Sequence, residues 1–190
     1  MPNWCANTLE ITHSDPEMIA RVRKSFVENS LLNEFVPVPQ DLKITAGFLG
    51  NGAEQQALEE QQTRNLATYG YTNWYEFCVS EWGTKWDIGG TTDQVQDIPN
   101  GVILTFDSAW SPPVNAYDKL LDLGFEIRAM YYEPGMGYAG VWDNGSDDCY
   151  EYGGMTSAAI AEFLPVELNE AYGISDAIAE WEVDQEVVDI

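Results

Sequence analysis

The chain has 190 residues, of which 32 are acidic and 8 are basic, and its formal net charge is −24 at pH 7. Apolar residues make up 45% and aromatic residues 13%, which is too rich for a disordered acidic chain and predicts one folded domain, with or without an appendage. This acid excess argues against direct nucleic-acid binding, because phosphates need Lys and Arg. No apolar run reaches the ~20 residues that would cross a bilayer, so no membrane partner is expected.

The first half of the chain mixes strand, helix and loop patterns. Residues 7–12 alternate and predict a strand, and Asp15, with Pro16 next to it, begins a helix over 15–29. The apolar stretch 32–38 ends in Pro-Val-Pro and predicts a short strand that runs into a loop. Composition then predicts a loop over 47–52 and helices over 53–67 and 73–81.

The second half first predicts a strand-like stretch over 85–96, a strand over 101–106, a helix over 112–123 and a strand over 125–132. A hairpin of 138–142 with 149–152 follows. The last part predicts helices over 156–164, 167–172 and 175–182, and a frayed end over 182–190. This order predicts an α+β fold, a ferredoxin-like antiparallel sheet with helices on one face. We expect this domain over 1–153, with a helical insertion at about 53–82, and an acidic helical extension over 154–190.

Charge is distributed unevenly along the chain. Arg128 is the last basic residue, and the 62 residues after it carry fourteen carboxylates. Such charge favours a surface that occupies a basic site on another protein, whereas the simpler interpretation is that it only keeps the protein soluble. The acidic residues expected to contact a partner are Asp176, Glu180, Glu182, Asp184, Glu186 and Asp189.

The three cysteines Cys5, Cys78 and Cys149 are far apart and odd in number, which does not predict a disulfide framework. We expect them to be buried and unreactive. The first five residues lack the basic and apolar regions of a signal peptide, so we expect a cytoplasmic protein. No paired C-x-x-C occurs, and neither a metal nor a cofactor is predicted.

Two stretches imitate ligand motifs without their structural context. Residues 135–140 match G-x-G-x-x-G, but a strand follows where a dinucleotide site needs a helix, so we predict a hairpin turn. Residues 143–148 begin like a calcium loop but lack the Gly and Glu of that template, which leaves a polar turn or a weak divalent site. No nucleophile motif occurs, so no catalytic residue is assigned. A carboxylate pair could still act as acid and base, but 32 acidic residues do not identify one, so the sequence favours a protein without enzyme activity and leaves the question open.

Aromatic residues are concentrated over 74–86, and the segment Trp82-Gly83-Thr84-Lys85-Trp86-Asp87 combines two tryptophans with a cation and an acid. Tryptophan offers a large stacking face with an N–H donor. Trp82, Lys85, Trp86 and Asp87, with Trp110, could therefore bind a flat or anionic small ligand such as a nucleotide. The alternative is that these tryptophans are core residues. Ser111 is expected to cap the helix that follows it.

Three segments together resemble one family: Met1-Pro2-Asn3-Trp4-Cys5-x-Asn7, the segment over 82–87, and Ala109-Trp110-Ser111-Pro112-Pro113. They are similar to the YubB-like family of uncharacterised bacteriophage and conjugative-plasmid proteins, over roughly residues 1–145. The resemblance implies a ferredoxin-like domain and an accessory role in managing a host. It implies no catalytic residue.

Two functions follow from these observations. The first is a non-enzymatic phage or plasmid accessory protein that binds and inhibits a basic host protein, such as a defence or nucleic-acid-binding protein, through an acidic surface that could mimic a nucleic acid. The alternative is a module that binds, sequesters or hydrolyses a nucleotide in the tryptophan-rich segment. The charge distribution favours the first.

Overall fold

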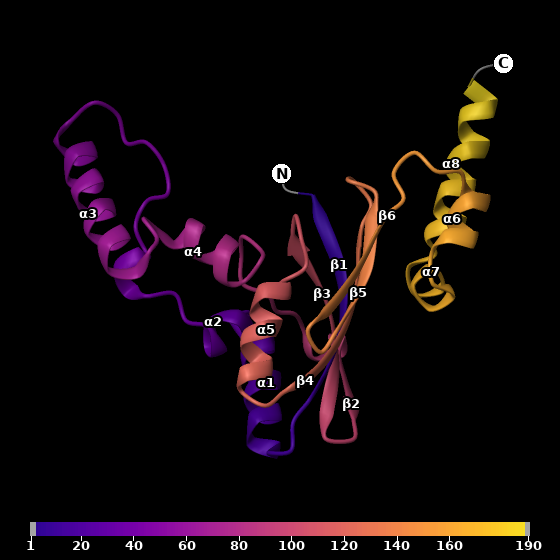
Figure 1. The fold of residues 1–190 in the computed structure, drawn as a ribbon, viewed down its shortest axis with the longest axis horizontal. Helices are drawn as coiled ribbons and strands as arrows, with labels where there is room; N and C mark the ends of the chain where they lie inside the picture. Colours follow the sequence, from indigo (N-terminus) through magenta and orange to yellow (C-terminus); the bar gives the residue numbers. More distant parts are fainter. Residues whose placement is uncertain (1–2, 189–190) are drawn as a thin grey trace.

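The computed structural model describes residues 3–188 and has an α+β fold built on one six-stranded antiparallel sheet (Figure 1). The strand order is β2-β3-β1-β4-β5-β6, so the first strand of the chain lies near the centre. The strands are β1 (Trp4–Thr12), β2 (Val95–Ile98), β3 (Gly101–Ala109), β4 (Glu126–Glu133), β5 (Tyr138–Asp143) and β6 (Ser146–Glu151). The predicted α+β class with an antiparallel, ferredoxin-like sheet is confirmed.

Helices cover both faces of this sheet. They are α1 (Pro16–Val27), α2 (Leu31–Phe35), α3 (Ala53–Tyr69), α4 (Trp74–Glu81), α5 (Val114–Asp122), α6 (Ser157–Phe163), α7 (Val166–Tyr172) and α8 (Ile174–Val188), with short 3-10 turns η1 (Gln40–Leu42) and η2 (Thr92–Gln94). Helices α3 and α4 form one arm, here called the insertion arm, and α6–α8 form a second, here called the acidic arm. The two arms lie at opposite ends of the long axis (Figure 1).

The main core lies between the sheet and helices α1, α2 and α5. Alternate residues of the central strands enter it, such as Leu9 and Ile11 from β1 and Ile127 from β4, because side chains of a strand alternate between faces. Phe26 of α1 and Tyr117 of α5 pack on them and are fully buried. This arrangement corresponds to the helix-covered face that the sequence predicted.

A second core attaches the acidic arm to the opposite face of β4 and β5. Ile160, Leu168 and Ile174 from the three helices are fully buried with Ala139 of β5. The Tyr172 hydroxyl donates to the carbonyl of Met130 at 2.8 Å. The acidic extension is therefore a packed layer and not a free tail, a position that the sequence did not predict.

Four local predictions were wrong, and tertiary contacts account for the first two. Residues 32–38 begin in helix α2 because the Asp87 carboxylate accepts hydrogen bonds from the backbone N–H groups of Leu32 and Asn33. The strand expected over 85–96 begins only at Val95, since a Cβ at Gly89 or Gly90 would overlap α1.

The other two concern helix ends. The Ser111 hydroxyl donates to the carbonyl of Gly83, and helix α5 begins at Val114 without a side-chain cap. Helix α8 continues to Val188 where fraying was expected from 182 onward.

The Gly135–Gly137 stretch is a turn before a strand, as predicted. The hairpin of β5 and β6 also forms, with Asn144 and Gly145 at positive φ.

We predict that Gly140→Ala destabilises the fold. A Cβ at this position of β5 would overlap the ring of Tyr131 on the neighbouring strand. Overpacking of this kind costs about 1–3 kcal/mol, which urea unfolding measures as a lower midpoint. Gly52→Ala is the matched control, because a Cβ there meets no atom within 4 Å. An unchanged midpoint for Gly140→Ala would contradict the packing described here.

Candidate functional site

Lys85 lies among three aromatic rings on the loop between α4 and β2. Its Nζ lies 4.8 Å from the ring centre of Trp86, 5.0 Å from that of Trp110 and 5.7 Å from that of Tyr75. An ammonium within about 6 Å of a ring face is attracted by the ring quadrupole. We call Lys85 with these three rings the lysine–tryptophan cluster.

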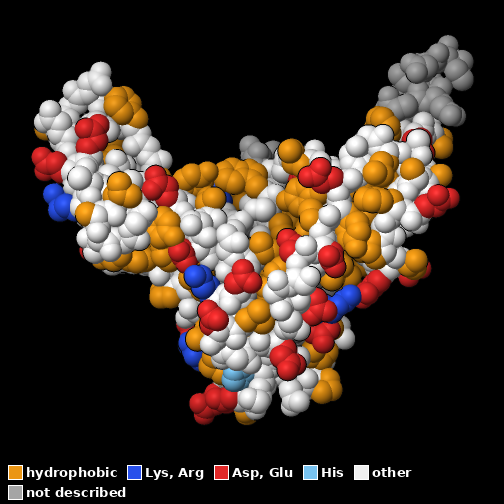
Figure 2. All heavy atoms as spheres, viewed as in Figure 1, with side chains coloured by type: hydrophobic (Ala, Val, Ile, Leu, Met, Phe, Trp, Pro, Cys, Tyr) orange, Lys and Arg blue, Asp and Glu red, His pale blue; other side chains and the backbone are white. Residues whose placement is uncertain are grey.

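Much of this cluster is open to solvent. Trp86 is 37% exposed and Trp110 is 41% exposed. Trp4, which is 48% exposed, places its ring centre 5.8 Å from that of Trp86. Hydrophobic side chains gather in the hollow between the two arms, near the N-terminal end of β1 (Figure 2). Exposed large aromatics in contact with one another are typical of binding surfaces.

The backbone of Trp110 is strained where it positions the indole ring in the cluster. Its φ is 70°, in the left-handed region that bulky residues rarely adopt. Two hydrogen bonds fix it there: its N–H donates to the carbonyl of Asn3 at 2.9 Å, and its carbonyl accepts from the Tyr138 hydroxyl at 2.7 Å. Such strain costs about 1–3 kcal/mol and is concentrated at functional sites.

A cavity of about 210 Å³ lies directly beside the cluster. It is lined by Val38, Lys43, Trp74, Cys78, Trp82, Lys85, Trp86 and Asp87. We call it the lysine pocket. The cavity lies between helix α4 of the insertion arm and the loop that carries Lys85. Its lining therefore combines residues that are more than thirty positions apart in the sequence, such as Val38 and Trp74.

The two lysines of this pocket differ from the other basic residues. Six of the eight bases lie within 4.0 Å of a carboxylate: Arg21, Arg23, Lys24, Arg64, Lys119 and Arg128. Among the side chains that the structure describes, Lys43 and Lys85 have no such carboxylate. In a chain with four times as many acids as bases, the positive charge that is not locally neutralised therefore lies at one site.

Two of the predicted ligand residues have structural roles. Trp82 is 3% exposed, and its indole N–H donates to the carbonyl of Val36 at 2.9 Å, so it is a core residue that forms only the back wall of the pocket. Asp87 accepts from Leu32 N at 2.7 Å and Ile88 N at 2.9 Å. Lys85, Trp86 and Trp110 lie together as predicted.

Lys43, Trp74, Tyr75 and Trp4 were missing from the predicted ligand set. Trp74 and Tyr75 were visible in the sequence as neighbours of the cluster, whereas Trp4 is far from it along the chain. Lys43 gave no such signal, because its approach to Lys85 depends on how the insertion arm folds back.

Cys78 lines the pocket but is not a nucleophile. Burial, followed by the nearby Asp87 carboxylate, raises the pKa of the Cys78 thiol to about 12. Burial likewise raises the pKa of Cys5 to about 12. Both thiols are therefore protonated near neutral pH, and only a thiolate attacks or binds metal. Cys149 is exposed on β6, which corrects the expectation that all three cysteines are buried.

The predicted partner-binding acids separate into two kinds. Asp176, Glu180 and Asp184 are exposed and follow one another at four-residue spacing, which aligns them along α8. Glu182 instead accepts hydrogen bonds from Ser157 N at 3.0 Å and Ser157 Oγ at 2.6 Å. The Glu186 side chain and Asp189 lie outside the described part of the structure.

The polar turn at 143–148 is occupied by internal contacts. Asp147 accepts a hydrogen bond from the Tyr131 hydroxyl at 2.7 Å, and the Asn144 side chain accepts from Ile127 N at 2.9 Å. Among the side chains that the structure describes, over residues 3–184, no three His, Cys, Asp or Glu are grouped closely enough to bind a metal ion. Over residues 3–188, no helix has the length and apolar character needed to cross a membrane.

No protein-family model matches this chain, and no curated protein matches it. Among solved structures, the chain is similar to the crystal structure of the protein api92 from Yersinia pseudotuberculosis, of the family DUF1281. The TM-score is 0.40 at 15% sequence identity, over 80% of this chain and 99% of that one.

We predict that one thiol of the folded protein reacts with dithionitrobenzoate at pH 8. Cys149 is exposed, whereas Cys5 and Cys78 are buried and hold their protons because burial raises the pKa of both to about 12. Absorbance should show one equivalent released quickly, and three equivalents after unfolding in urea. Cys149→Ser should abolish the fast phase. A fast phase that survives in this variant would mean that a buried cysteine is accessible.

Proposed function

We propose that this protein binds a flat, anionic small molecule of the nucleotide class in the lysine pocket and the adjoining lysine–tryptophan cluster. The observation that carries this proposal is the placement of Lys43 and Lys85. They are the two bases without a neighbouring carboxylate among the described side chains, and both line one tryptophan-walled cavity. An anion approaching a surface of net charge −24 is attracted only where positive charge is free.

The shape and chemistry of the site indicate which part of the ligand it takes. The exposed rings of Trp86 and Trp110 offer stacking faces for a planar base. The ammonium groups of Lys43 and Lys85 offer point charges for a phosphate. The 210 Å³ cavity is smaller than the usual 300–1,000 Å³ of a drug-sized site. It therefore fits a single ring or phosphate group, with the rest of the ligand lying over the exposed tryptophans.

The residues of the pocket support binding of the ligand and not its hydrolysis. A hydrolytic site needs an activated nucleophile or a general base. The thiol of Cys78 is protonated near neutral pH, because burial and Asp87 raise its pKa to about 12. The carboxylate of Asp87 is already engaged by the backbone N–H groups of Leu32, Asn33 and Ile88. We therefore assign the pocket a sequestering role.

We predict that Lys85→Gln weakens nucleotide binding about tenfold, equivalent to about 1.4 kcal/mol. The change removes one unneutralised charge and keeps a polar, hydrogen-bonding side chain. Tryptophan fluorescence of the full chain, titrated with nucleoside mono-, di- and triphosphates, measures the affinity because Trp86 and Trp110 border the site. Lys24→Gln is the matched control, since it removes the same charge from a lysine paired with Glu28. Equal affinities for the two variants, or no fluorescence change with any nucleotide, would reject the proposal.

A second candidate function is favoured by the acidic arm. We propose that this arm binds the basic surface of another protein, as a phage or plasmid accessory factor would do to inhibit a host protein. Its helices lie in a stretch that contains no Lys or Arg, and Asp176, Glu180 and Asp184 form an exposed row along α8. The second core fixes this row on the sheet, so binding would not require ordering of the helix.

We predict that the triple variant Asp176→Asn, Glu180→Gln, Asp184→Asn captures fewer basic proteins from a host lysate than the native chain. The native interaction should be released by high salt and competed by duplex DNA, because complementary charge is screened and a nucleic-acid site would be shared. Glu54→Gln, Glu59→Gln, Glu60→Gln is the matched control, which removes the same charge from the insertion arm. Equal capture by both triple variants would assign the effect to net charge alone.

A further inference from the structure

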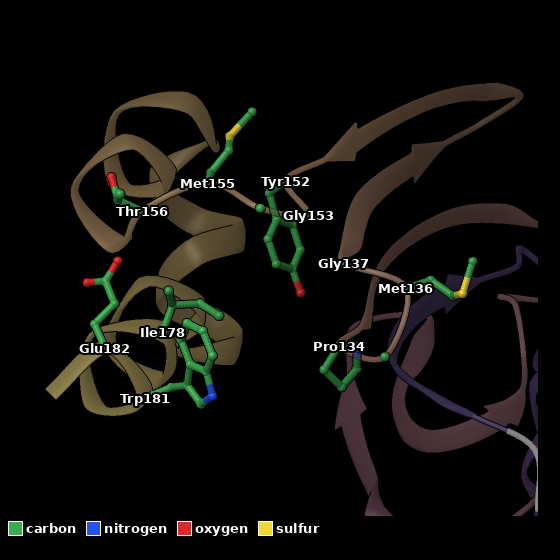
Figure 3. Close-up of a pocket in the computed structure, with 12 residues that line it drawn as sticks. Pro134, Met136, Gly137, Tyr152, Gly153, Met155, Thr156, Ile178, Trp181 and Glu182 are labelled. Atoms are coloured by element: carbon green, nitrogen blue, oxygen red, sulfur yellow. The ribbon is translucent and has the colours of Figure 1, made fainter. Parts of the chain in front are cut away.

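A groove with a volume of about 560 Å³ separates the acidic arm from the turn between β4 and β5. In Figure 3, Ile178, Trp181 and Glu182 of α8 form one wall, and Pro134 and Gly137 of the turn face them. Tyr152 and Gly153 lie between the two walls at the end of β6 (Figure 3). This cavity is distinct from the lysine pocket and shares no lining residue with it.

Large apolar side chains line the groove and remain open to solvent. Met136 is 72% exposed, Trp181 is 59% exposed and Met155 is 36% exposed. Methionine is flexible and polarisable, so grooves rich in it adapt to partners of different shape. The groove is also lined by glycines at 135, 137, 153 and 154, which have no side chains to fill the space beside these residues. We call this cavity the methionine groove.

The charge around the groove selects a cationic occupant. Every lining residue comes from the stretch after Arg128, which contains no Lys or Arg. The carboxylate of Glu182 is fixed at the rim by its two hydrogen bonds from Ser157, which hold its pKa below the ordinary value. Asp184 is exposed three residues after Trp181, and therefore about one turn along the same side of α8. A second copy of this chain, also at −24, would be repelled.

We propose that the methionine groove binds a basic amphipathic helix of a partner protein. A large apolar side chain of that helix would enter the groove against Ile178 and Trp181, with Met136 and Met155 at its edge, and its Lys or Arg residues would lie against the carboxylates of α8. An apolar anchor seated in a groove with charged residues around it is a common mode of helix recognition. This inference rests on the second proposed function, partner binding by the acidic arm, and it specifies the site and the chemistry of the partner.

The test uses the full chain and a defined probe. A labelled 18-residue helix-forming peptide carries Leu and Trp on one face and Lys on the other, and its scrambled version has the same composition without the apolar face. Fluorescence anisotropy at 0.1 M salt should show at least tenfold tighter binding of the amphipathic peptide. Trp181→Ala should remove this preference while leaving charge-dependent binding of both peptides. Leu66→Ala, which truncates a 53% exposed residue on the insertion arm, is the control and should keep it.

The possible results separate this inference from the function on which it rests. Equal binding of the two peptides, or a preference that survives in Trp181→Ala, would overturn the groove assignment while leaving the acidic arm as a partner site. Failure of the native chain to bind either peptide would overturn both. Weaker binding of both peptides by the Asp176, Glu180, Asp184 triple variant, with normal preference in Leu66→Ala and none in Trp181→Ala, is the result that we expect.

Discussion

The carboxylate of Asp87 holds together the part of the molecule in which the lysine–tryptophan cluster lies. It accepts hydrogen bonds from Leu32, Asn33 and Ile88, so it begins helix α2 and fixes the loop after α4 at once. Burial raises the pKa of this carboxyl, and the three N–H donors offset that cost. With the loop fixed, Trp82 enters the core, while the neighbouring Lys85 and Trp86 of the same loop remain partly exposed. The aromatic site therefore depends on an acid that is itself unavailable to a ligand.

Charge distinguishes the two functions proposed for this chain. An anionic ligand in the lysine pocket must approach against the field of −24, and salt would screen that repulsion as well as the local attraction to Lys43 and Lys85. A basic partner of the acidic arm gains from the whole field, and salt can only weaken it. Added salt should therefore change ligand affinity at the lysine pocket only slightly, whereas it should lower partner affinity at the acidic arm strongly.

The sequence predicted elements whose pattern is local and missed those that tertiary contacts decide. Alternation over 7–12 and the Asn144-Gly145 turn were sufficient to locate β1 and the last hairpin. Residues 32–38 are apolar enough for a strand, and only the distant Asp87 makes them begin as a helix. The same limit applies to the site. Lys85, Trp86 and Trp110 lie in motifs and were found, whereas Lys43 is separated from them by the whole insertion arm.

The β4–β5 hairpin connects the two candidate sites. At its far end the turn over 134–137 forms a wall of the methionine groove, and the next residue, Tyr138, donates its hydroxyl to the carbonyl of Trp110. That hydrogen bond helps hold Trp110 at its φ of 70° beside Lys85. A helix seated in the groove would contact the turn one residue away from this hydrogen bond. Because linkage is reciprocal, if partner binding shifted Tyr138 and so changed ligand affinity by some factor, ligand binding would change partner affinity by that same factor.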